Sequence, residues 1–356
     1  MLYEQGHRGG PILSVERLLQ AQAKCIRVIL VVGDDEPQLA YHFDLVGAFP
    51  ASQMNGNGAA FYEDMVLRIA TSMSATDINQ HRVVGEPIAR AVWNSLSTPK
   101  AMCQAGYELG VREFFTDTVH IASLVPVPAV AGAVASQYSE GCYATWDVTL
   151  NALIATVTGS ARPVEKKAIT EDDLALIAGV REDYLGALVW EVEGKRNDPP
   201  SSEAVEMFDM DGDLPCIQLG PEWLVQGEAP VIRSKLHGHR GVSAFNPAQV
   251  EYVPLDAPYL RYFVSCGTDR QARGVRDAFS RSEVMRNPDD PRPLAFTILP
   301  GHGVVIAEKW VAGKAPFQVM WEAMDAGDIV IDSRVPQSLF SYLPGEDGRM
   351  AVVEER

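Results

Sequence analysis

The sequence has few cysteines and few basic residues, and each shortage excludes a class of protein. Its five cysteines are odd in number and widely separated, with no C-x-x-C pair, so neither a zinc ribbon nor a thioredoxin-like dithiol is predicted. Reduced thiols in a reducing compartment fit this pattern. Only 30 of the 356 residues are Lys or Arg, against 47 Asp or Glu, and the formal net charge is −17. An acidic chain without a basic block lacks the footprint for nucleic acid or for an anionic membrane surface.

The apolar segments are too short to span a membrane. The longest nearly uncharged stretch runs from Ile121 to Ser136, contains two prolines, and falls short of the roughly 20 apolar residues that a transmembrane helix requires. Residues 1–20 lack the basic start, apolar run and small-residue cleavage site of a secretory signal. We therefore expect a folded cytoplasmic protein whose partner is a small-molecule substrate, with no nucleic acid and no membrane.

Common nucleotide-binding and hydrolase motifs are also missing. The glycines in residues 55–58 do not form a G-x-G-x-x-G sequence after a strand, and no P-loop consensus occurs. Residues 158–161 lack the second glycine of a nucleophile elbow, which disfavours a serine hydrolase. Asp209 begins an acidic run that resembles part of a calcium loop, but Leu214 and Gly220 stand where an EF-hand needs glycine and glutamate. An exposed acidic turn is the preferred interpretation of that run.

The residues that are present indicate a mixed α and β protein. Hydrophobic residues make up 47% of the chain and charged residues 22%, close to the globular average. We predict an α/β N-terminal part and a more strongly β C-terminal part of α+β type, built on an antiparallel sheet or a small barrel. A charged, proline-containing segment near residue 165 suggests two domains, 1–165 and 166–356.

Apolar patterns predict the individual elements. Strands are expected at 26–33, 113–125, 142–157, 185–192, 294–299 and 304–310, with further short strands between 214 and 264. Helices are expected at 60–72, 87–96, 99–109, 268–284 and 317–326. Thr170 and Asp173 have the spacing of a capping box, so another helix is predicted to begin there and to end near Glu182.

The most pointed chemical feature is the pair His237 and His239, which follows a strand-like segment. In an extended chain, side chains two positions apart project to the same face, so both imidazoles can bind one divalent metal. Gly238 between them leaves room for a ligand to approach closely. His302, which lies between two glycines after another predicted strand, would complete a three-histidine set with an open position for water or substrate. In the alternative interpretation, the segment with His237 and His239 is a polar strand end and the segment with His302 is a hairpin turn. The histidines then form hydrogen bonds only with water and backbone.

Two further histidines stand near carboxylates. His42 and Asp44 are two positions apart in a strand-like segment, whereas the spacing of Asp117 and His120 suits a helix better. Each pair is able to bind Zn, Mn or Fe, or to orient the histidine as a general base, and ordinary structural hydrogen bonding is the alternative. We take His120 and Asp117, together with Arg240, as candidate catalytic residues.

A second candidate site lies where a predicted strand meets a helix, at Cys266–Asp269. Thr268 and Gln271 have the spacing of a capping box, so the first-turn N–H groups and the positive dipole end of the helix would face this corner. Such a corner can hold a phosphate or carboxylate, with Gly267, Thr268 and Arg270 as candidate anion-binding residues, or it can activate the adjacent thiol. Helical spacing puts Arg270 nearly opposite the apolar face, where solvent is its alternative partner.

The preferred function is a metal-dependent enzyme of lyase/aldolase or isomerase type. Its substrate would be a small polar molecule, carbohydrate-like or bearing a carboxylate or phosphate. A divalent Zn, Mn, Fe or Mg ion held by the three histidines would stabilise the negative charge of an enolate, and Arg240 would hold a substrate anion. A carboxylate would complete the coordination or move the proton, and the candidates are Glu222, Glu308 and Asp44.

Two other functions remain open. One is a metal-free enzyme that uses the Cys266–Asp269 corner as its anion site, and the other is a non-catalytic binding or assembly protein with structural histidines. A homo-oligomer is also considered, because Trp223, Trp310 and Trp321 are able to bury aromatic surface between subunits, although core packing is the more common role of tryptophan.

Overall fold

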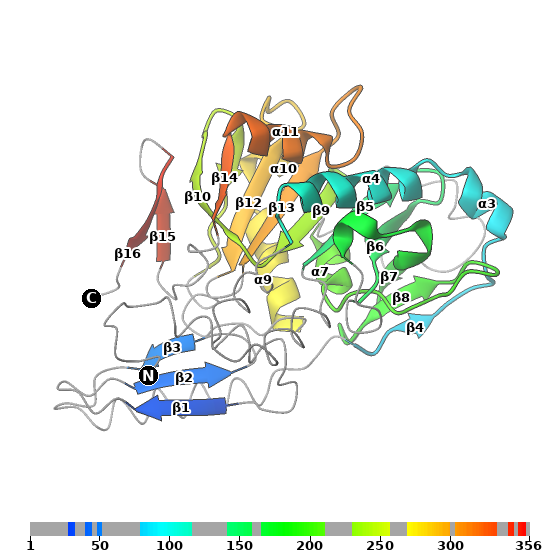
Figure 1. Cartoon of the computed structure of the whole chain (residues 1–356), viewed down its shortest axis with the longest axis horizontal. Helices are drawn as coiled ribbons and strands as arrows, with labels where there is room; N and C mark the ends of the chain where they lie inside the picture. Colours follow the sequence, from blue (N-terminus) through cyan, green and yellow to red (C-terminus); the bar gives the residue numbers. More distant parts are fainter. Residues whose placement is uncertain are drawn as a thin grey trace.

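A computed structural model describes residues 28–32, 40–44, 48–51, 79–115, 141–158, 165–210, 230–256, 269–299, 303–332, 341–344 and 348–353. Helices and strands both occur within these ranges, and a large mixed sheet lies between them (Figure 1). The prediction of a mixed α and β protein is confirmed.

The large sheet has nine strands in the order β11-β12-β13-β9-β5-β6-β7-β8-β4. Their bounds are Val250–Tyr252 (β11), Leu294–Leu299 (β12), Gly303–Lys309 (β13), Ile232–Gly238 (β9), Cys142–Asp147 (β5), Ala152–Thr156 (β6), Leu174–Val180 (β7), Ala187–Trp190 (β8) and Arg82–Val83 (β4). Neighbouring strands are antiparallel except at the two edges, where β11 is parallel to β12 and β4 is parallel to β8. Strand β9 is therefore an inner strand, hydrogen-bonded to β13 on one side and to β5 on the other.

Strands from both sides of the expected boundary at residue 165 enter this sheet. Strand β6 precedes the boundary and β7 follows it, and the two are antiparallel neighbours with Ile154 opposite Leu176. The charged segment near residue 165, which includes the short 3-10 helices η1 (Lys166–Ala168) and η2 (Glu171–Asp173), connects these two strands.

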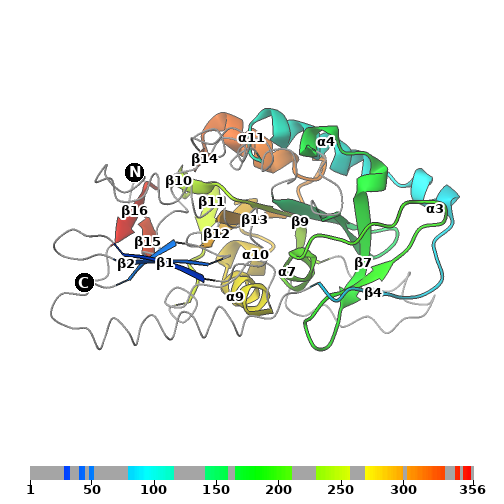
Figure 2. The same ribbon diagram turned by 60° about the horizontal axis from the view of Figure 1, so that its bottom comes forward.

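Helices cover both faces of the sheet. Figure 2 shows α4 (Thr98–Val111) and α11 (Gln318–Ala326) above it, and α7 (Ala204–Asp209), α9 (Asp269–Phe279) and α10 (Glu283–Arg286) below it. Helix α3 (Arg90–Ser95) precedes α4. Successive side chains of β5 divide between the two layers, since Tyr143 packs with the apolar residues of α4 and α11, while Cys142 and Ala144 pack with those of α7 and α9. This is the period-two alternation expected of a sheet that is buried on both faces.

Three smaller sheets complete the described structure. Strands β1 (Val28–Val32), β2 (Ala40–Asp44) and β3 (Ala48–Ala51) form an antiparallel sheet. Strand β10 (Gly241–Phe245) pairs with β14 (Ile329–Asp332), and β15 (Ser341–Pro344) pairs with β16 (Met350–Val353). Strand β10 begins three residues after β9 ends, so the chain from His239 to Arg240 links the large sheet to the β10–β14 pair.

Most predicted elements that fall in the described ranges are confirmed. Strands β1, β5, β6, β8, β12 and β13 and helices α3, α4 and α11 lie within or close to their predicted bounds. The predicted helix at 60–72 and most of the predicted strand at 113–125 lie outside the described residues, and Phe114 and Phe115 belong to a turn.

One predicted helix is wrong, and a second is confirmed in position but is divided in two. The capping box of Thr170 and Asp173 forms, but it starts a single 3-10 turn, and strand β7 follows because Leu174–Val180 is a continuous apolar run that is buried along its whole length. The single helix expected at 268–284 is divided into α9 and α10. The break comes at Ser282, whose extended backbone and hydroxyl cap the N-terminus of α10 by accepting from the Met285 N–H.

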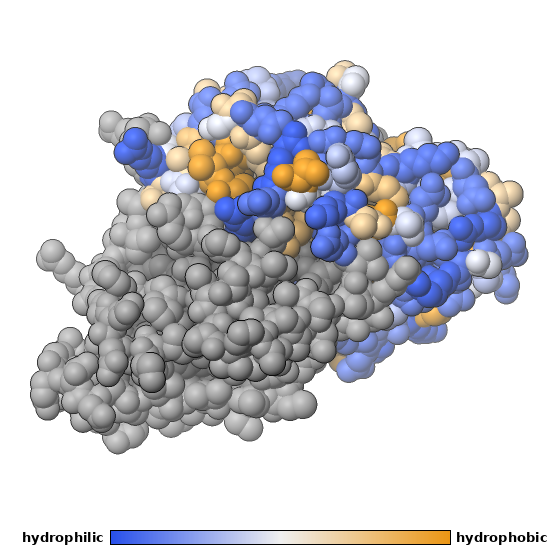
Figure 3. Space-filling view, viewed as in Figure 1, coloured by the Kyte–Doolittle hydropathy of each residue, from blue (hydrophilic) through white to orange (hydrophobic). Residues whose placement is uncertain are grey.

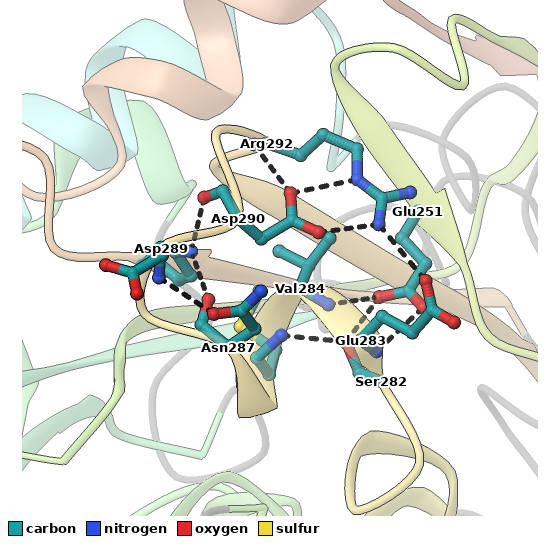
Figure 4. A network of polar contacts seen from close by, with 10 residues as sticks. Glu251, Ser282, Glu283, Val284, Asn287, Asp289, Asp290 and Arg292 are labelled. Carbon is teal, nitrogen blue, oxygen red and sulfur yellow. Dashed lines mark hydrogen bonds and ion pairs between the residues drawn. The ribbon is translucent and has the colours of Figure 1, made fainter.

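A polar network fixes α10 to the edge of the sheet (Figure 4). The Glu251 carboxylate of β11 accepts hydrogen bonds from the Ser282 hydroxyl and from the N–H groups of Glu283 and Val284. Asp290 and Arg292 form an ion pair in the loop that leads to β12, with 2.7 Å between Asp290 Oδ2 and Arg292 Nη2. Hydrogen bonds from Arg292 hold the pKa of Asp290 down at about 2.

On the face shown in Figure 3, the surface of the described residues is largely hydrophilic. Figure 3 shows hydrophobic residues only in a few small groups on the face in view. Within the described ranges, no helix combines the length and the apolar character that a membrane crossing requires.

Glu308 of β13 is a buried carboxyl that caps α11. Its Oε1 atom accepts from the backbone N–H of Phe317 at 2.9 Å and from the Ser234 hydroxyl at 3.0 Å, and the residue is 1% exposed. Burial raises the pKa of Glu308 from 4.5 to about 7, although these hydrogen bonds and the nearby Arg233 act in the opposite direction. The proton on Glu308 is therefore held more tightly in the folded chain than in the unfolded chain.

A Glu308→Gln variant tests this coupling. Because the folded-state pKa is raised, the stabilisation from protonated Glu308 is fully present below pH 4.5 and is lost as the pH rises through about 7. Relative to the variant, the native protein is expected to lose about 3 kcal/mol of unfolding free energy between these limits. Denaturant unfolding at about pH 5 and about pH 8 measures the difference, with Glu86→Gln as an exposed control. Identical pH dependence of the native protein and Glu308→Gln would contradict the assignment.

Candidate functional site

His237 and His239 lie side by side at the end of β9. Their ring centroids are 5.4 Å apart and their planes meet at 64°. His237 is fully buried and His239 is half-buried. The two imidazoles thus approach each other from positions i and i+2, as the strand spacing predicts.

A backbone carbonyl orients the buried histidine. The Nδ1 atom of His237 lies 3.1 Å from the carbonyl oxygen of Val304 in β13. A carbonyl only accepts hydrogen bonds, so Nδ1 carries the hydrogen, and in the neutral ring the lone pair is on Nε2. A second ring nitrogen fixed in this way is the usual arrangement of a metal-binding histidine.

Glycines allow unusually close backbone packing around the pair. A Cβ atom on Gly303 would lie 1.9 Å from the carbonyl oxygen of Gly238, and one on Gly238 would lie 2.3 Å from the Phe114 ring. Gly141, at a φ of +63°, packs equally tightly against the carbonyl oxygen of His237. The prediction that Gly238 makes room for a ligand is therefore wrong, because the Phe114 ring fills that space.

A third metal ligand is not found beside the two histidines in the described part of the chain. In those ranges, no three His, Cys, Asp or Glu side chains gather in a way that suits a metal ion. His302 lies outside the described residues and directly precedes Gly303, the first residue of β13. Its role as the third ligand stays a prediction.

Arg240 is the candidate catalytic residue that the structure describes. It follows His239 and is half-buried, and its Nη1 atom donates to the carbonyl oxygen of Glu113 at 3.2 Å. Arg270 belongs to the first turn of α9, and His42 and Asp44 belong to β2. The other candidates lie outside the described residues: Asp117, His120, Glu222, Cys266, Gly267 and Thr268.

Glu308, a candidate partner of the histidines, is on the wrong face of the sheet. In the antiparallel pair of β13 and β9, Val305 is opposite His237, whereas Glu308 is opposite Ser234. Residues three apart in a strand point to opposite faces, so Glu308 faces α11 and His237 faces α7 and α9. Glu308 caps a helix and does not share a site with the histidines.

A buried polar cluster lies on the His237 face and was not predicted. Cys142 of β5 is directly opposite His237, so their side chains share one face at the short spacing of a cross-strand pair. Near Cys142, the Ser201 hydroxyl donates to Glu203 Oε2, and Gln271 Nε2 of α9 donates to Glu206 Oε2 at 2.6 Å. These residues are all at least nine-tenths buried: Cys142, Ser201, Glu203, Glu206 and Gln271.

The electrostatics of this cluster favour neutral acids. Burial raises the pKa of the Cys142 thiol well above its ordinary value, and the nearby carboxyls of Glu203 and Glu206 add to the shift. Cys142 is therefore a protonated thiol and not a nucleophile. Burial, followed by the adjacent Glu203, raises the pKa of Glu206 from 4.5 to about 8, against a smaller opposing effect of Gln271.

One signal in the sequence could have revealed the cluster. Glu206 interrupts the apolar run AVEMF, three positions after Glu203. Carboxylates at i and i+3 share a helix face, and an otherwise apolar helix buries that face. The preceding GKRNDPPSS segment has the composition of a linker, which predicts an exposed connection and not a buried cluster.

Comparison with known proteins does not identify a family for this chain. No family model matches the chain, and no curated protein matches it. One similar solved structure is described as L-fuculose 1-phosphate aldolase, with a TM-score of 0.35 and 13% sequence identity over 65% of this chain and 84% of that chain.

The close contact at Gly303 is testable by adding one methyl group. In Gly303→Ala, the new Cβ collides with the backbone of β9, so we expect a loss of about 3 kcal/mol of unfolding free energy. Gly179→Ala in β7 is the matched control, because its Cβ meets the Leu188 side chain only at 3.4 Å or more, and we expect a change below about 1 kcal/mol. Denaturant unfolding compares the two. Equal stabilities would show that β13 does not pack on Gly238 in this way.

Proposed function

We propose that this chain is a metal-dependent enzyme whose divalent cation is held by His237, His239 and His302. The side-by-side imidazoles of His237 and His239 carry the proposal, and the contact of His237 Nδ1 with the Val304 carbonyl makes Nε2 the ring nitrogen that would bind a metal.

The packing of β13 supports the third ligand. Gly303 lies against the end of β9, where an added Cβ would be 2.8 Å from the His239 Cα. His302 is joined to Gly303 by one peptide link, and successive Cα atoms are about 3.8 Å apart. We propose His302 as the third ligand because it is covalently joined to Gly303.

The donor set fits some metals better than others. Three neutral imidazoles suit Zn, and also Fe or Mn, whereas Mg prefers oxygen ligands. Three protein ligands leave a coordination position for substrate or water. A cation bound there would act as a Lewis acid and stabilise negative charge that develops on a substrate oxygen.

Other residues of the chain would bind the substrate and move its proton. Arg240, beside His239, presents a planar guanidinium that suits a carboxylate or phosphate. Such a local positive group is needed because the formal net charge of −17 repels a small anion from the molecule as a whole. Glu203, in the cluster opposite His237, is the carboxylate that we assign to proton abstraction.

The proposed chemistry is aldol cleavage, dehydration or aldose–ketose isomerisation of a small polar substrate. Each of these reactions places negative charge on an oxygen beside the reacting carbon, which a cation and a nearby carboxylate are suited to handle. A cytoplasmic location and self-association belong to the same proposal.

Elemental analysis of the purified protein tests the metal. We expect about one equivalent of a transition metal per chain, and its loss from a His237→Ala/His239→Ala double variant, because two of three ligands are removed. A His302→Ala variant should lower the metal affinity on the same grounds.

His81→Ala is the matched control for these variants. His81 accepts a hydrogen bond from the Ala187 N–H of β8, so its removal deletes an imidazole in another part of the sheet. Full metal content in this variant is expected. The proposal fails if the double variant keeps its metal, or if no preparation binds any.

A further inference from the structure

We propose that Glu203 and Glu206 form a carboxyl pair that holds one proton, with Glu206 as the protonated acid and Glu203 as the ionised base of the site around His237. This inference rests on the proposed function and assigns the proton donor within it. It assigns to Glu206 the role of proton donor to the substrate.

The pair is positioned by two helices and the sheet. Glu203 directly precedes α7 and Glu206 lies in its first turn, three residues later, so both carboxyls occupy the same side of the helix. Helix α7 packs on α9, and Gln271 of α9 donates its amide hydrogen to Glu206 Oε2. Ser201 donates to Glu203 from the other side.

One oxygen of Glu206 is left for a ligand. Its Oε1 atom has no hydrogen-bond partner among the described residues. Because the residue is only 2% exposed, bulk water does not reach this atom. A buried carboxyl oxygen without a partner costs about 1–3 kcal/mol, so such atoms usually meet a ligand or an ordered water. A substrate oxygen in the site would be the natural hydrogen-bond partner.

The surrounding groups favour a proton on Glu206. Glu203 is a like charge on the same helix face, and Cys142 of β5 is a neutral thiol at its high pKa. From α9 the contact is the uncharged Gln271. Strand β9 contributes His237 and the fully buried Lys235 to the same face of the sheet. Burial and the like charge outweigh the other effects and place the pKa of Glu206 at about 8.

The proton count of the pair is conserved through a reaction. Glu203 accepts a proton from a substrate C–H or O–H group. When a C–H proton is removed, its electron pair forms a C=C bond and the carbonyl π pair moves to the carbonyl oxygen. When an O–H proton is removed, a new C=O bond forms, the adjacent C–C bond breaks, and the electron pair of that bond moves toward the substrate carbonyl. Glu206 then gives its proton to the substrate atom that has gained the electron pair. The pair has passed from Glu203 carboxylate and Glu206 acid to Glu203 acid and Glu206 carboxylate, with one proton throughout.

The direct test is to titrate the carboxyl carbons by NMR of protein with ¹³C-labelled glutamate. We expect one glutamate signal with a midpoint near pH 8, absent from Glu206→Gln, which keeps the shape and the Gln271 contact. In Glu203→Gln the same signal should move to lower pH, because the like charge is removed. If Glu206→Gln does not fold, the shift of the midpoint in Glu203→Gln tests the carboxyl pair by itself.

Zinc addition then separates this inference from the proposed function. A bound cation near the pair should lower the Glu206 midpoint by about one pH unit, a tenfold change in proton affinity, and the shift should vanish in His237→Ala/His239→Ala. The carboxyl pair is wrong if Glu206 titrates in the ordinary range, or if its midpoint is unmoved while zinc binds stoichiometrically. Absence of stoichiometric zinc binding would instead overturn the proposed function, and with it the place of the pair in that site.

Discussion

The structure depends on the antiparallel pairing of β5, β9 and β13. This pairing places His237 between Cys142 on one side and Val305 on the other, and it brings the start of β13 against Gly238. Side chains that oppose one another across antiparallel strands share a face, so the register alone decides which groups meet. A slip of one residue would turn His237 toward α11 and separate it from the carboxyls of α7. The glycine contact at Gly303 resists that slip, because no larger residue fits there.

The elements that the sequence predicts well are those whose local pattern agrees with their environment. Strand β12 matches its predicted range, and β13 and α11 begin within one residue of theirs. Continuous apolar residues favour a buried strand, and apolar residues at helical spacing favour a helix, so the local pattern and the tertiary environment agree at these elements. The capping box at Thr170 shows the limit of a local signal. It forms as predicted, yet the seven buried apolar residues after it enter the sheet, since tertiary burial on both faces outweighs a helix start.

The site is less predictable than the fold because it is built from long-range pairing. The neighbouring imidazoles of His237 and His239 follow from strand geometry, and so were visible in the sequence. The placement of Cys142 opposite His237, and of Glu203 near Cys142, depends on a pairing between distant segments that no local spacing encodes. Glu308 illustrates the opposite error. It resembles a candidate ligand in a sequence, but its register places it on the other face of the sheet.

The two buried glutamates on opposite faces show how a structural carboxyl differs from a chemical one. Glu308 lies at the N-terminus of α11, near Arg233, and its raised pKa reflects burial that backbone N–H groups and a cation partly offset. Each carboxyl has one buried oxygen without a hydrogen-bond partner among the described residues, Oε2 in Glu308 and Oε1 in Glu206. Glu206 differs because it lies beside a like charge and receives one amide hydrogen bond. The helix cap and Arg233 offset part of the cost of burying Glu308, whereas the like charge of Glu203 adds to the cost of burying Glu206. The like-charged pair of Glu203 and Glu206 lies on the same face of the sheet as His237, and Glu308 lies on the other face, which is why we assign chemistry to the pair and a structural role to Glu308.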